Sequence, residues 1–235
     1  MPRPMNRPAL PLASTVRMLA VALGLMSAGS ISVHSQSSTV QIDENVIASA
    51  EKKFGVAARK RLEDWQALLA SGRGKSESEK LTLVNDFFNK IIWVSDPEHW
   101  KKNDYWATPL EMLATNGGDC EDFAIAKYFT LVALGVPDEK LKITYVKTRD
   151  PNPINQSHMV LAYYSTPSGQ PLILDNLIPQ IKSGAQRADL TPVYSFNGSG
   201  LWLAKEKGAG KQVEGGSSNI AFWRDLTSRM GKEFN

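Results

Sequence analysis

Residues 119–134 constrain the fold more than any other segment, because they are apolar almost throughout. Apolar side chains fill most of the segment, which is interrupted chiefly by Glu121, Asp122 and Lys127. A helix that is apolar on nearly every side has to be buried by other elements. Asp119 is a typical N-cap residue, and Gly135 begins a helix-ending sequence that includes Pro137. The sequence therefore predicts a central, buried helix with secondary structure packed around it.

The chain before this helix has the periodicity and capping residues of further helices. Residues 44–70 carry an apolar stripe at helical spacing, interrupted near residues 54–55. Ser76 with Glu79 forms a capping box, which predicts a helix from there to about residue 90. Thr108 followed by Pro109 predicts the start of a short helix that ends at residues 116–118. The intervening residues 93–107 show no regular pattern.

The chain after the buried helix changes to a period of two, which is typical of strands. A last helix is expected at 219–230, and residues 205–217, rich in Gly, Lys and Ser, are expected to be mobile. The expected strands are 141–147, 157–164, 171–175, 193–196 and 201–203. Helices therefore come first and an antiparallel sheet follows. This order predicts an α+β domain in which an N-terminal helical lobe and the sheet pack around the buried helix.

Residues 1–35 have the features of a secretory signal peptide. Arg3, Arg7 and Arg17 are the only charged residues there, an apolar run follows at 18–26, and small residues follow at 27–30. Cleavage is expected near Ala28 or near Ser35; the alternative is an uncleaved N-terminal anchor. The mature domain would then be residues 36–235, exported from the cytoplasm. Its 24 basic residues equal its 24 acidic residues, so no basic excess argues for nucleic acid as a partner.

Cys120 is the only cysteine in the chain, and it stands among Asp119, Glu121 and Asp122. An unpaired cysteine in an exported protein suggests a reactive thiol. The start of a helix lowers a thiol pKa, whereas neighbouring carboxylates raise it. Two interpretations follow: either Cys120 is a buried, inert thiol, or something nearby cancels the negative charge.

A nucleophilic cysteine needs a base, and the base needs a group that orients it. Outside the signal segment the chain has only two histidines, His99 and His158. His158 begins an expected strand, and Asp175 ends the next one. Adjacent antiparallel strands can bring these two side chains together, and Cys120 at a helix start completes the layout of a papain-like triad. Each residue alone also has an ordinary structural explanation: a small apolar side chain, a packed imidazole or a turn former.

Four motifs carry a resemblance to a known family. The sequence contains Trp106-x-Thr108-Pro109-x-Glu111-x-Leu113, then GDCEDFAIAKY at 118–128, SHMVL at 157–161 and LDN at 174–176. Over about residues 75–205 the chain resembles the bacterial transglutaminase-like cysteine proteases, most closely the periplasmic members that act on biofilm adhesins. The resemblance implies a papain/transglutaminase-like core. It also implies Cys120 as nucleophile, His158 as general base and Asp175 as the orienting acid.

The resemblance further implies calcium dependence, with Asp119 and Glu121 among the ligands. Calcium prefers several hard oxygen ligands, and a bound divalent ion would reverse the effect of these acids on the thiol. Asp122 would either complete the ligand set or cap the helix, and Asn103 or Asp104 could supply further ligands. The alternative for Asp119 and Glu121 is helix capping without metal.

Acyl transfer also needs donors for an oxyanion. The backbone N–H of Cys120 is one, and the resemblance offers the indole of Trp106 as another, with plain packing as the alternative. The resemblance implies cleavage of a large adhesin near a pair of alanines. It also implies control by an inner-membrane LapD-type receptor for cyclic-di-GMP. The alternatives are a transglutaminase that passes the acyl group to an amine and a non-catalytic secreted binding module.

Overall fold

The computed structural model describes residues 42–149, 156–204 and 210–233. These residues belong to one compact unit, Ser38–Asn235. The expected signal segment, residues 1–35, lies outside the described residues, as do residues 205–209 of the stretch expected to be mobile. Within the described part of the chain, no helix combines the length and the apolar character needed to cross a membrane.

The first two helices are α1 (Glu44–Phe54) and α2 (Val56–Gly72), and they are separated at Gly55 as expected. Gly55 has a φ of 84°, a conformation that glycine adopts without steric cost. The Asp43 side chain caps α1 by accepting from the Asn45 amide at 2.7 Å. Helix α2 ends at Gly72, two residues beyond the helical stripe expected at 44–70.

The capping boxes predicted from sequence both form. Ser76 caps α3 (Glu77–Phe88), and Thr108 caps α5 (Pro109–Thr115), each with a glutamate at the third helical position. Asp119 is the N-cap of the buried helix α6 (Cys120–Ala133), as expected. The last helix, α7 (Ala221–Glu233), begins and ends slightly later than predicted.

The stretch 93–107, expected to be irregular, contributes to two short elements. These are β1 (Ile92–Trp93), which pairs in parallel with β2 (Gly117–Gly118), and the single-turn helix α4 (Asp96–His99). Two-residue strands are too short to show a periodicity, so no sequence pattern indicates them. Their consequence is positional, because the pairing fixes Trp93 beside Gly118, two residues before Cys120.

The main sheet has seven antiparallel strands in the order β6-β5-β4-β3-β7-β8-β9. Five correspond to the expected strands, and the two-residue strands β6 and β9 were missed. Within the stretch 205–217, which was expected to be mobile, the described residues form β9 and the beginning of the 3₁₀ turn Gly216–Asn219. The strands are β3 (Leu141–Thr148), β4 (Ser157–Tyr163), β5 (Leu172–Leu174), β6 (Lys182–Ser183), β7 (Leu190–Phe196), β8 (Leu201–Leu203) and β9 (Lys211–Gln212).

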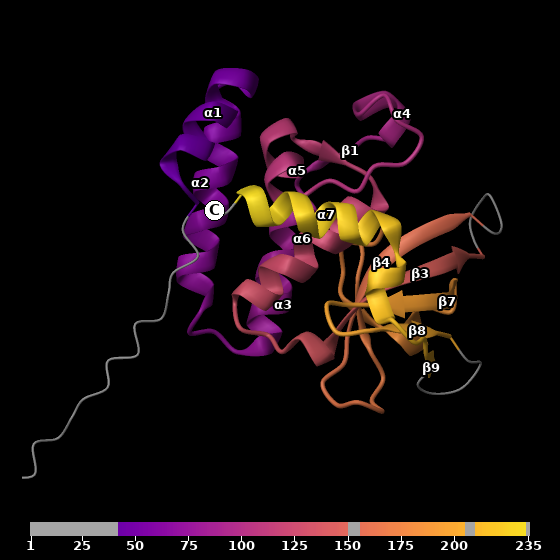
Figure 1. The fold of residues 1–235 in the computed structure, drawn as a ribbon. Coiled ribbons are helices and arrows are strands. Elements are labelled where there is room, and N and C mark those ends of the chain that lie inside the picture. Colours follow the sequence, from indigo (N-terminus) through magenta and orange to yellow (C-terminus); the bar gives the residue numbers. More distant parts are fainter. Residues whose placement is uncertain (1–41, 150–155, 205–209, 234–235) are drawn as a thin grey trace, which may run out of the picture. The chain divides into compact units, whose positions relative to one another are not determined.

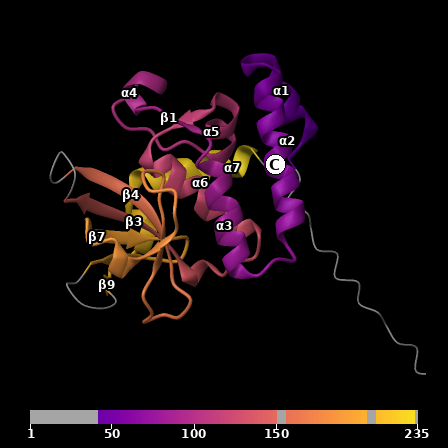
Figure 2. The same cartoon turned by 180° about the vertical axis from the view of Figure 1, so that it is seen from behind.

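Helix α6 lies between the helical lobe and the sheet in both views of the ribbon (Figures 1 and 2). Most of its apolar residues are buried, as the sequence predicted, although Val132 near its end is 37% exposed. Trp65 of α2 donates from its indole to Thr130 of α6 at 3.0 Å. On the far side of the sheet a smaller apolar cluster forms from Val146, Val160, Ala162 and Ile173. The fold is thus α+β around one buried helix, and it sets the N-terminus of α6 against the start of β4.

Candidate active site

His158 and Asp175 meet at the ends of two neighbouring strands. Strands β4 and β5 pair antiparallel with Leu161 opposite Leu174, so His158 and Asp175 lie diagonally across the pair on one face. His158 Nε2 lies 2.8 Å from Asp175 Oδ1, and both side chains are buried. The sequence predicted this pairing from the spacing of the two strands.

Asp175 is held as an ionised carboxylate. Burial opposes its ionisation, but the hydrogen bond and charge of His158, the Leu177 amide and the charge of Arg187 outweigh burial and lower the pKa of Asp175 to about 2. The Leu177 N–H donates to Oδ1 at 3.0 Å. Because an ionised carboxylate can only accept, His158 must donate from Nε2. In a neutral imidazole that donates from Nε2, Nδ1 is the nitrogen without a proton, and it can act as a base.

Cys120 begins α6 and is partly exposed rather than sealed in the core. Its thiol donates to Glu121 Oε2 at 3.0 Å, and its sulfur also accepts from the backbone N–H of Met159. Because Met159 directly follows His158, that contact sets the thiol beside the His158–Asp175 pair. Burial raises the pKa of the Cys120 thiol, and the charge and hydrogen bond of Glu121 and the charge of Asp119 raise it further.

An acidic cluster surrounds the thiol turn. In each of two trios, Asp96–Asp104–Glu121 and Asp96–Asp119–Asp122, one oxygen per residue lies within 4.8 Å of the others. Burial and then the charge of neighbouring acids raise the pKa of Asp119 to about 8, and burial and the charge of Asp119 raise that of Asp96 to about 6. These carboxylates are therefore close enough together to oppose one another's ionisation.

The cluster fits a calcium ion. The Oδ1 atoms of Asp96 and Asp119 are both buried, and neither has a hydrogen-bond partner among the described residues. Buried polar atoms are normally satisfied, so unpartnered carboxylate oxygens converging on one spot suit a hard cation that takes oxygen ligands. Asp96, Asp104, Asp119 and Glu121 would be the residues to hold it.

Asp122 is engaged differently from the other acids. Its Oδ1 accepts from the Ala107 amide at 2.7 Å, and its Oδ2 accepts from the Asp119 amide at 3.2 Å. Both carboxylate oxygens of Asp122 thus accept from backbone amides, which supports the interpretation that Asp122 caps the helix. A Cβ atom at Gly118 would lie 2.7 Å from Asp122 Oδ2. Glycine at this position is therefore what lets the cap approach the thiol turn.

Trp106 is buried and stacks between Phe196 and Phe222, with ring centroids 5.6 Å away in each case. Its indole hydrogen-bonds the Asp104 carboxyl, so in this structure the indole N–H is directed at the acidic cluster. Asn103, the other ligand considered from sequence, is exposed.

Three features of the site had no clear signal in the sequence. Asp96 lies far upstream of Asp119 in the chain, and only the fold of α4 brings it to the cluster. Arg187, which faces Asp175, follows a short 3₁₀ turn that has no distinctive pattern. Trp93 and Leu177 are 55% and 60% exposed; Trp93 pairs with Gly118, and Leu177 donates to Asp175, so both lie beside the site.

Comparisons with known proteins agree with this geometry. The family model described as "bacterial transglutaminase-like cysteine proteinase BTLCP" matches residues 64–192, more than half of the chain. No protein with a curated functional description matches the chain significantly. Among solved structures, Legionella pneumophila LapG is 44% identical, with a TM-score of 0.67, and the match covers 80% of this chain and 96% of that one.

Two further LapG structures from the same organism match at the same identity and the same coverage of this chain. One is EGTA-treated, with a TM-score of 0.68 and 96% of its chain covered. The other is calcium-bound, with a TM-score of 0.67 and 98% of its chain covered. The family expected from the sequence motifs and its transglutaminase-like fold are thereby confirmed. The chain belongs to the bacterial transglutaminase-like cysteine proteinases and is similar to LapG.

Proposed function

We propose that this protein is a periplasmic, calcium-dependent cysteine endopeptidase in which Cys120, His158 and Asp175 form the catalytic triad. The observation that carries the proposal is the buried His158–Asp175 pair, 2.8 Å apart, next to the Met159 amide that contacts the only thiol in the chain. A nucleophile, a base and an orienting acid in this relation are the parts that acyl transfer requires.

The proton path follows from the tautomer of His158. Nε2 donates to the ionised Asp175, so Nδ1 takes the proton from the Cys120 thiol. The thiolate attacks the scissile carbonyl carbon and forms a tetrahedral oxyanion. The imidazolium then gives its proton to the leaving amine, and the C–N bond breaks to leave a thioester on Cys120. Water, deprotonated by His158, attacks the thioester, which releases the acid and restores the thiol.

The oxyanion needs donors that point at the reacting carbonyl. The backbone N–H of Cys120 at the start of α6 is one candidate, and it adds the positive end of the helix dipole. We assign the indole N–H of Trp106 as the second donor. Because that N–H is directed at Asp104, the assignment requires the indole to leave Asp104 when substrate binds.

Calcium is proposed as the cofactor, held by Asp119 and Glu121 with Asp96 and Asp104. A bound calcium ion would supply positive charge that offsets these carboxylates beside the thiol. The raised pKa of Cys120 and its hydrogen bond to Glu121 both support a role for such a charge, because they show what the acids do when nothing balances them. The calcium-bound form of LapG supports the same assignment.

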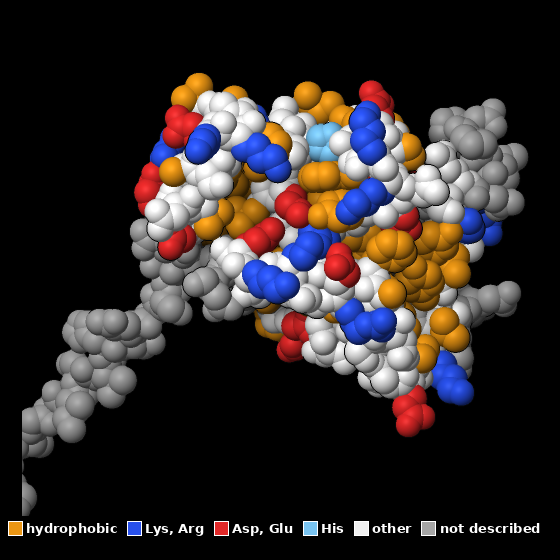
Figure 3. Space-filling view, turned by 45° about the horizontal axis from the view of Figure 1, so that its top comes forward, with side chains coloured by type: hydrophobic (Ala, Val, Ile, Leu, Met, Phe, Trp, Pro, Cys, Tyr) orange, Lys and Arg blue, Asp and Glu red, His pale blue; other side chains and the backbone are white. Residues whose placement is uncertain are grey.

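For the substrate we propose the N-terminal region of a large cell-surface adhesin, cut near a pair of alanines, so that cleavage releases the adhesin and promotes biofilm dispersal. Exposed Trp93 and Leu177 beside the site support an apolar peptide segment as substrate. The surface in Figure 3 also presents hydrophobic side chains among interspersed acidic and basic ones, with no extended region of one charge. Control by an inner-membrane LapD-type receptor for cyclic-di-GMP belongs to the same proposal.

The proposal is tested by incubating residues 36–235 with an N-terminal adhesin fragment that contains a di-alanine sequence. The reaction is run with calcium, with EGTA, and with EGTA followed by excess calcium. We expect cutting with calcium, loss of cutting with EGTA and recovery on adding calcium back. Mass spectrometry of the products separates hydrolysis from transfer to an amine, because a transglutaminase would give a cross-linked product instead.

Two variants complete the test. Cys120→Ala removes the proposed nucleophile and should abolish cutting, whereas His99→Gln changes the other histidine of the mature chain and should leave cutting in place. Cutting by Cys120→Ala would remove Cys120 from the mechanism. Cutting that persists in EGTA would keep the triad and exclude calcium as an essential cofactor.

A further inference from the structure

Arg187 faces the carboxylate oxygen of the proposed orienting acid that His158 does not contact. Asp175 uses Oδ1 for His158 and for the Leu177 amide. Its other oxygen, Oδ2, lies 2.8 Å from Arg187 Nη1, and the two side chains are 0% and 3% exposed. Neither Oδ2 nor Nη1 has a hydrogen-bond partner elsewhere in the described residues, so the two atoms depend on each other.

The guanidinium group of Arg187 is itself held in place by Asp189. Its Nε donates to Asp189 Oδ1 at 3.0 Å, and its Nη2 donates to Asp189 Oδ2 at 2.8 Å. This two-point contact fixes the plane of the guanidinium, which a lysine amine at the same position could not reproduce. The Asp189 backbone is fixed too, because its carbonyl accepts from the Arg149 amide at 2.8 Å.

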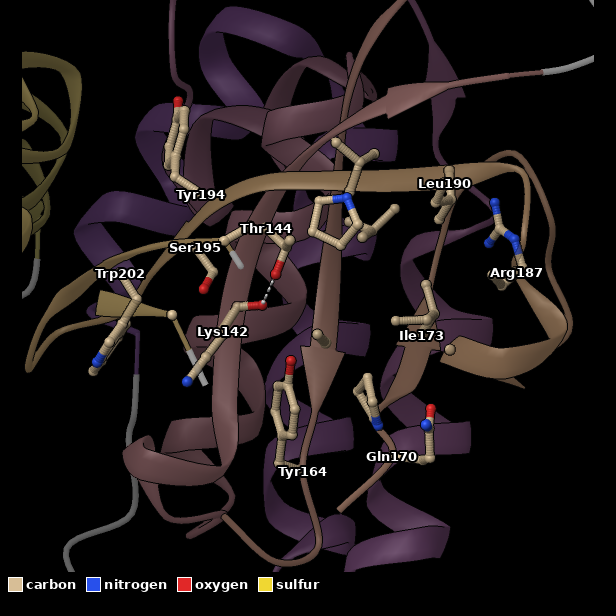
Figure 4. A pocket seen from close by; sticks show the side chains of 18 of the residues that line it. Lys142, Thr144, Tyr164, Gln170, Ile173, Arg187, Leu190, Tyr194, Ser195 and Trp202 are labelled. Atoms are coloured by element: carbon tan, nitrogen blue, oxygen red, sulfur yellow. Dashed lines mark hydrogen bonds between the residues drawn. The ribbon is translucent and has the colours of Figure 1, made fainter. Parts of the chain in front are cut away.

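The chain brings Arg187 to Asp175 by a tight local path. After β6 the chain makes the 3₁₀ turn Gly184–Gln186, and the Arg187 amide closes that turn on the Gly184 carbonyl at 3.1 Å. Figure 4 shows the Arg187 side chain at the edge of a pocket of about 420 Å³ on the outer face of the sheet, near Leu190. Arg187 therefore separates the proposed active site from that pocket.

Burial strengthens the attraction between Arg187 and Asp175, but it also removes both charged groups from water, which costs free energy. A buried carboxylate without a partner would lose ionisation or rotate to find a donor. The charged groups that face Asp175 are His158 on β4, Arg187 after β6 and Lys127 on α6. Of the two basic side chains, Arg187 and Lys127, only Arg187 contacts an Asp175 oxygen, because the Lys127 amine donates to Asn85 at 3.0 Å.

We propose that Arg187 is a positioning residue of the proposed active site, which holds Asp175 ionised and turned so that Oδ1 faces His158, and that Asp189 holds Arg187 in place. The expected effect on kcat rests on the proposed function, whereas the expected effect on the orientation of Asp175 and His158 does not. Arg187 acts through Asp175 and His158 and does not contact substrate. Its loss should therefore lower kcat with little change in KM.

The experiment compares Arg187→Met, Arg187→Lys and Asp189→Asn with Arg59→Met. Arg59 is a matched control, because it also pairs with more than one carboxylate, Glu44, Glu51 and Glu63, but on the α1–α2 surface. Each variant is checked for folding by circular dichroism. The kcat and KM for the adhesin fragment are measured with calcium present. The tautomer of His158 is read by ¹⁵N NMR of histidine-labelled protein, with His99→Gln used for assignment.

We expect Arg187→Met to lower kcat by about 100-fold and to lose the single Nε2-protonated tautomer of His158. Arg187→Lys keeps the positive charge but not the two-point contact of the guanidinium. It should keep the His158 tautomer and lower kcat by about tenfold. Arg59→Met should match the unmodified protein in both readouts. Folded Arg187→Met with unchanged kcat and an unchanged tautomer would overturn the proposal.

The two readouts separate the failure of this inference from the failure of the proposed function. If the unmodified protein cuts no adhesin fragment, the kinetic comparison disappears, but the tautomer of His158 still decides whether Arg187 orients the pair. If Arg187→Met does not fold, Arg187→Lys and Asp189→Asn decide it. If both of these variants have the same His158 tautomer and the same kcat as the unmodified protein, the proposal is overturned.

Discussion

The two sides of the thiol differ in how their charges are balanced. On one side, His158, Asp175, Arg187 and Asp189 form a buried chain in which each charged group faces a partner. On the other side, Asp96, Asp104, Asp119 and Glu121 gather without any cation among the described residues in their contacts. The pKa of Asp175 is accordingly lowered, whereas the pKa of every acid in the cluster is raised.

Under the proposed function, the protein alone completes one half of the site and a calcium ion completes the other half. The paired side, which consists of His158, Asp175, Arg187 and Asp189, is already organised for chemistry before substrate arrives. A side with unbalanced carboxylates is organised only when a cation binds, and it can therefore respond to the concentration of that cation. The predictions below break or sharpen this contrast, from the largest expected effect to the smallest.

Asp175→Asn should break the paired side most completely. An amide in place of the carboxylate can present a donor to His158 and so favour the wrong tautomer, and it leaves Arg187 without its acceptor. We expect kcat to fall by about 10³- to 10⁴-fold, as for the loss of the orienting acid in other triads. Steady-state cleavage kinetics check this. A fall of less than about tenfold would show that Asp175 does not orient His158.

Asp119→Asn should break the unpaired side. For the unmodified protein we expect calcium at about 100 times its Kd to stabilise the fold by about 2.7 kcal/mol, because the ion binds only the folded state. Asp119→Asn removes a ligand charge and should lose most of that gain. Chemical unfolding with calcium and with EGTA measures the difference. Asp86→Asn is a control, because Asp86 lies on α3 and outside the cluster. Equal calcium stabilisation of Asp119→Asn and the unmodified protein would contradict the ligand assignment.

Gly118→Ala tests the segment between the two sides of the thiol, where the Asp122 side chain caps the turn that carries Cys120. A Cβ at Gly118 would lie 2.7 Å from Asp122 Oδ2 and would force the cap away from the Ala107 and Asp119 amides. We expect a loss of roughly 1–3 kcal/mol in the free energy of unfolding. Gly74→Ala is the matched control, since a Cβ there meets nothing within 4 Å. Equal denaturation midpoints for the two variants would show that the close approach is unimportant.

Lys127 sharpens the contrast, because its amine is buried on the paired side, where it donates to Asn85 and forms no ion pair within the described part of the chain. Burial lowers the pKa of Lys127 to about 7, against the opposing charges of Asp175 and Asp86. The unfolded chain keeps an ordinary lysine pKa, so it binds more protons than the folded chain between pH 7 and about 10. The stability of the fold should therefore rise with pH through this window, by at most about 1.4 kcal/mol per pH unit, and should be flat in this respect below pH 7.

Lys127→Met should abolish that slope. The measurement is the free energy of unfolding of both proteins from pH 6 to pH 9 with calcium in excess, so that the acidic cluster does not contribute differently. Parallel curves for the two proteins would show that Lys127 remains charged throughout, in spite of its burial.

What the sequence could predict depended on how local the signal was. Helix α6, the capping residues Ser76 and Thr108, and the strand pair that joins His158 to Asp175 each follow from patterns within a short segment, and the structure has them. For the acids beside Cys120 the sequence left two interpretations open, an inert thiol or a nearby charge that cancels them. Both came from neighbouring residues in the chain and needed no knowledge of the fold.

Other parts of the site depend on contacts between distant segments. Asp96 reaches the acidic cluster only through the helical turn α4, and Arg187 reaches Asp175 only after the β5–β6 return. The pairing of Trp93 with Gly118 uses two-residue strands, which are too short to show a period. A single sequence contains no local pattern for such contacts, so both sides of the thiol could be predicted only in part.

The most direct test of this account is the rate at which Cys120 reacts with iodoacetamide at pH 7. The chain contains no other cysteine, so every alkylation event reports this thiol. The rate is measured with calcium and with EGTA, in the unmodified protein and in Asp119→Asn. If calcium balances the acidic cluster, EGTA should slow alkylation of the unmodified protein by roughly tenfold or more, the effect of one pKa unit on the thiolate population. The same rate with calcium and with EGTA would contradict the view that the unpaired side is completed by a cation.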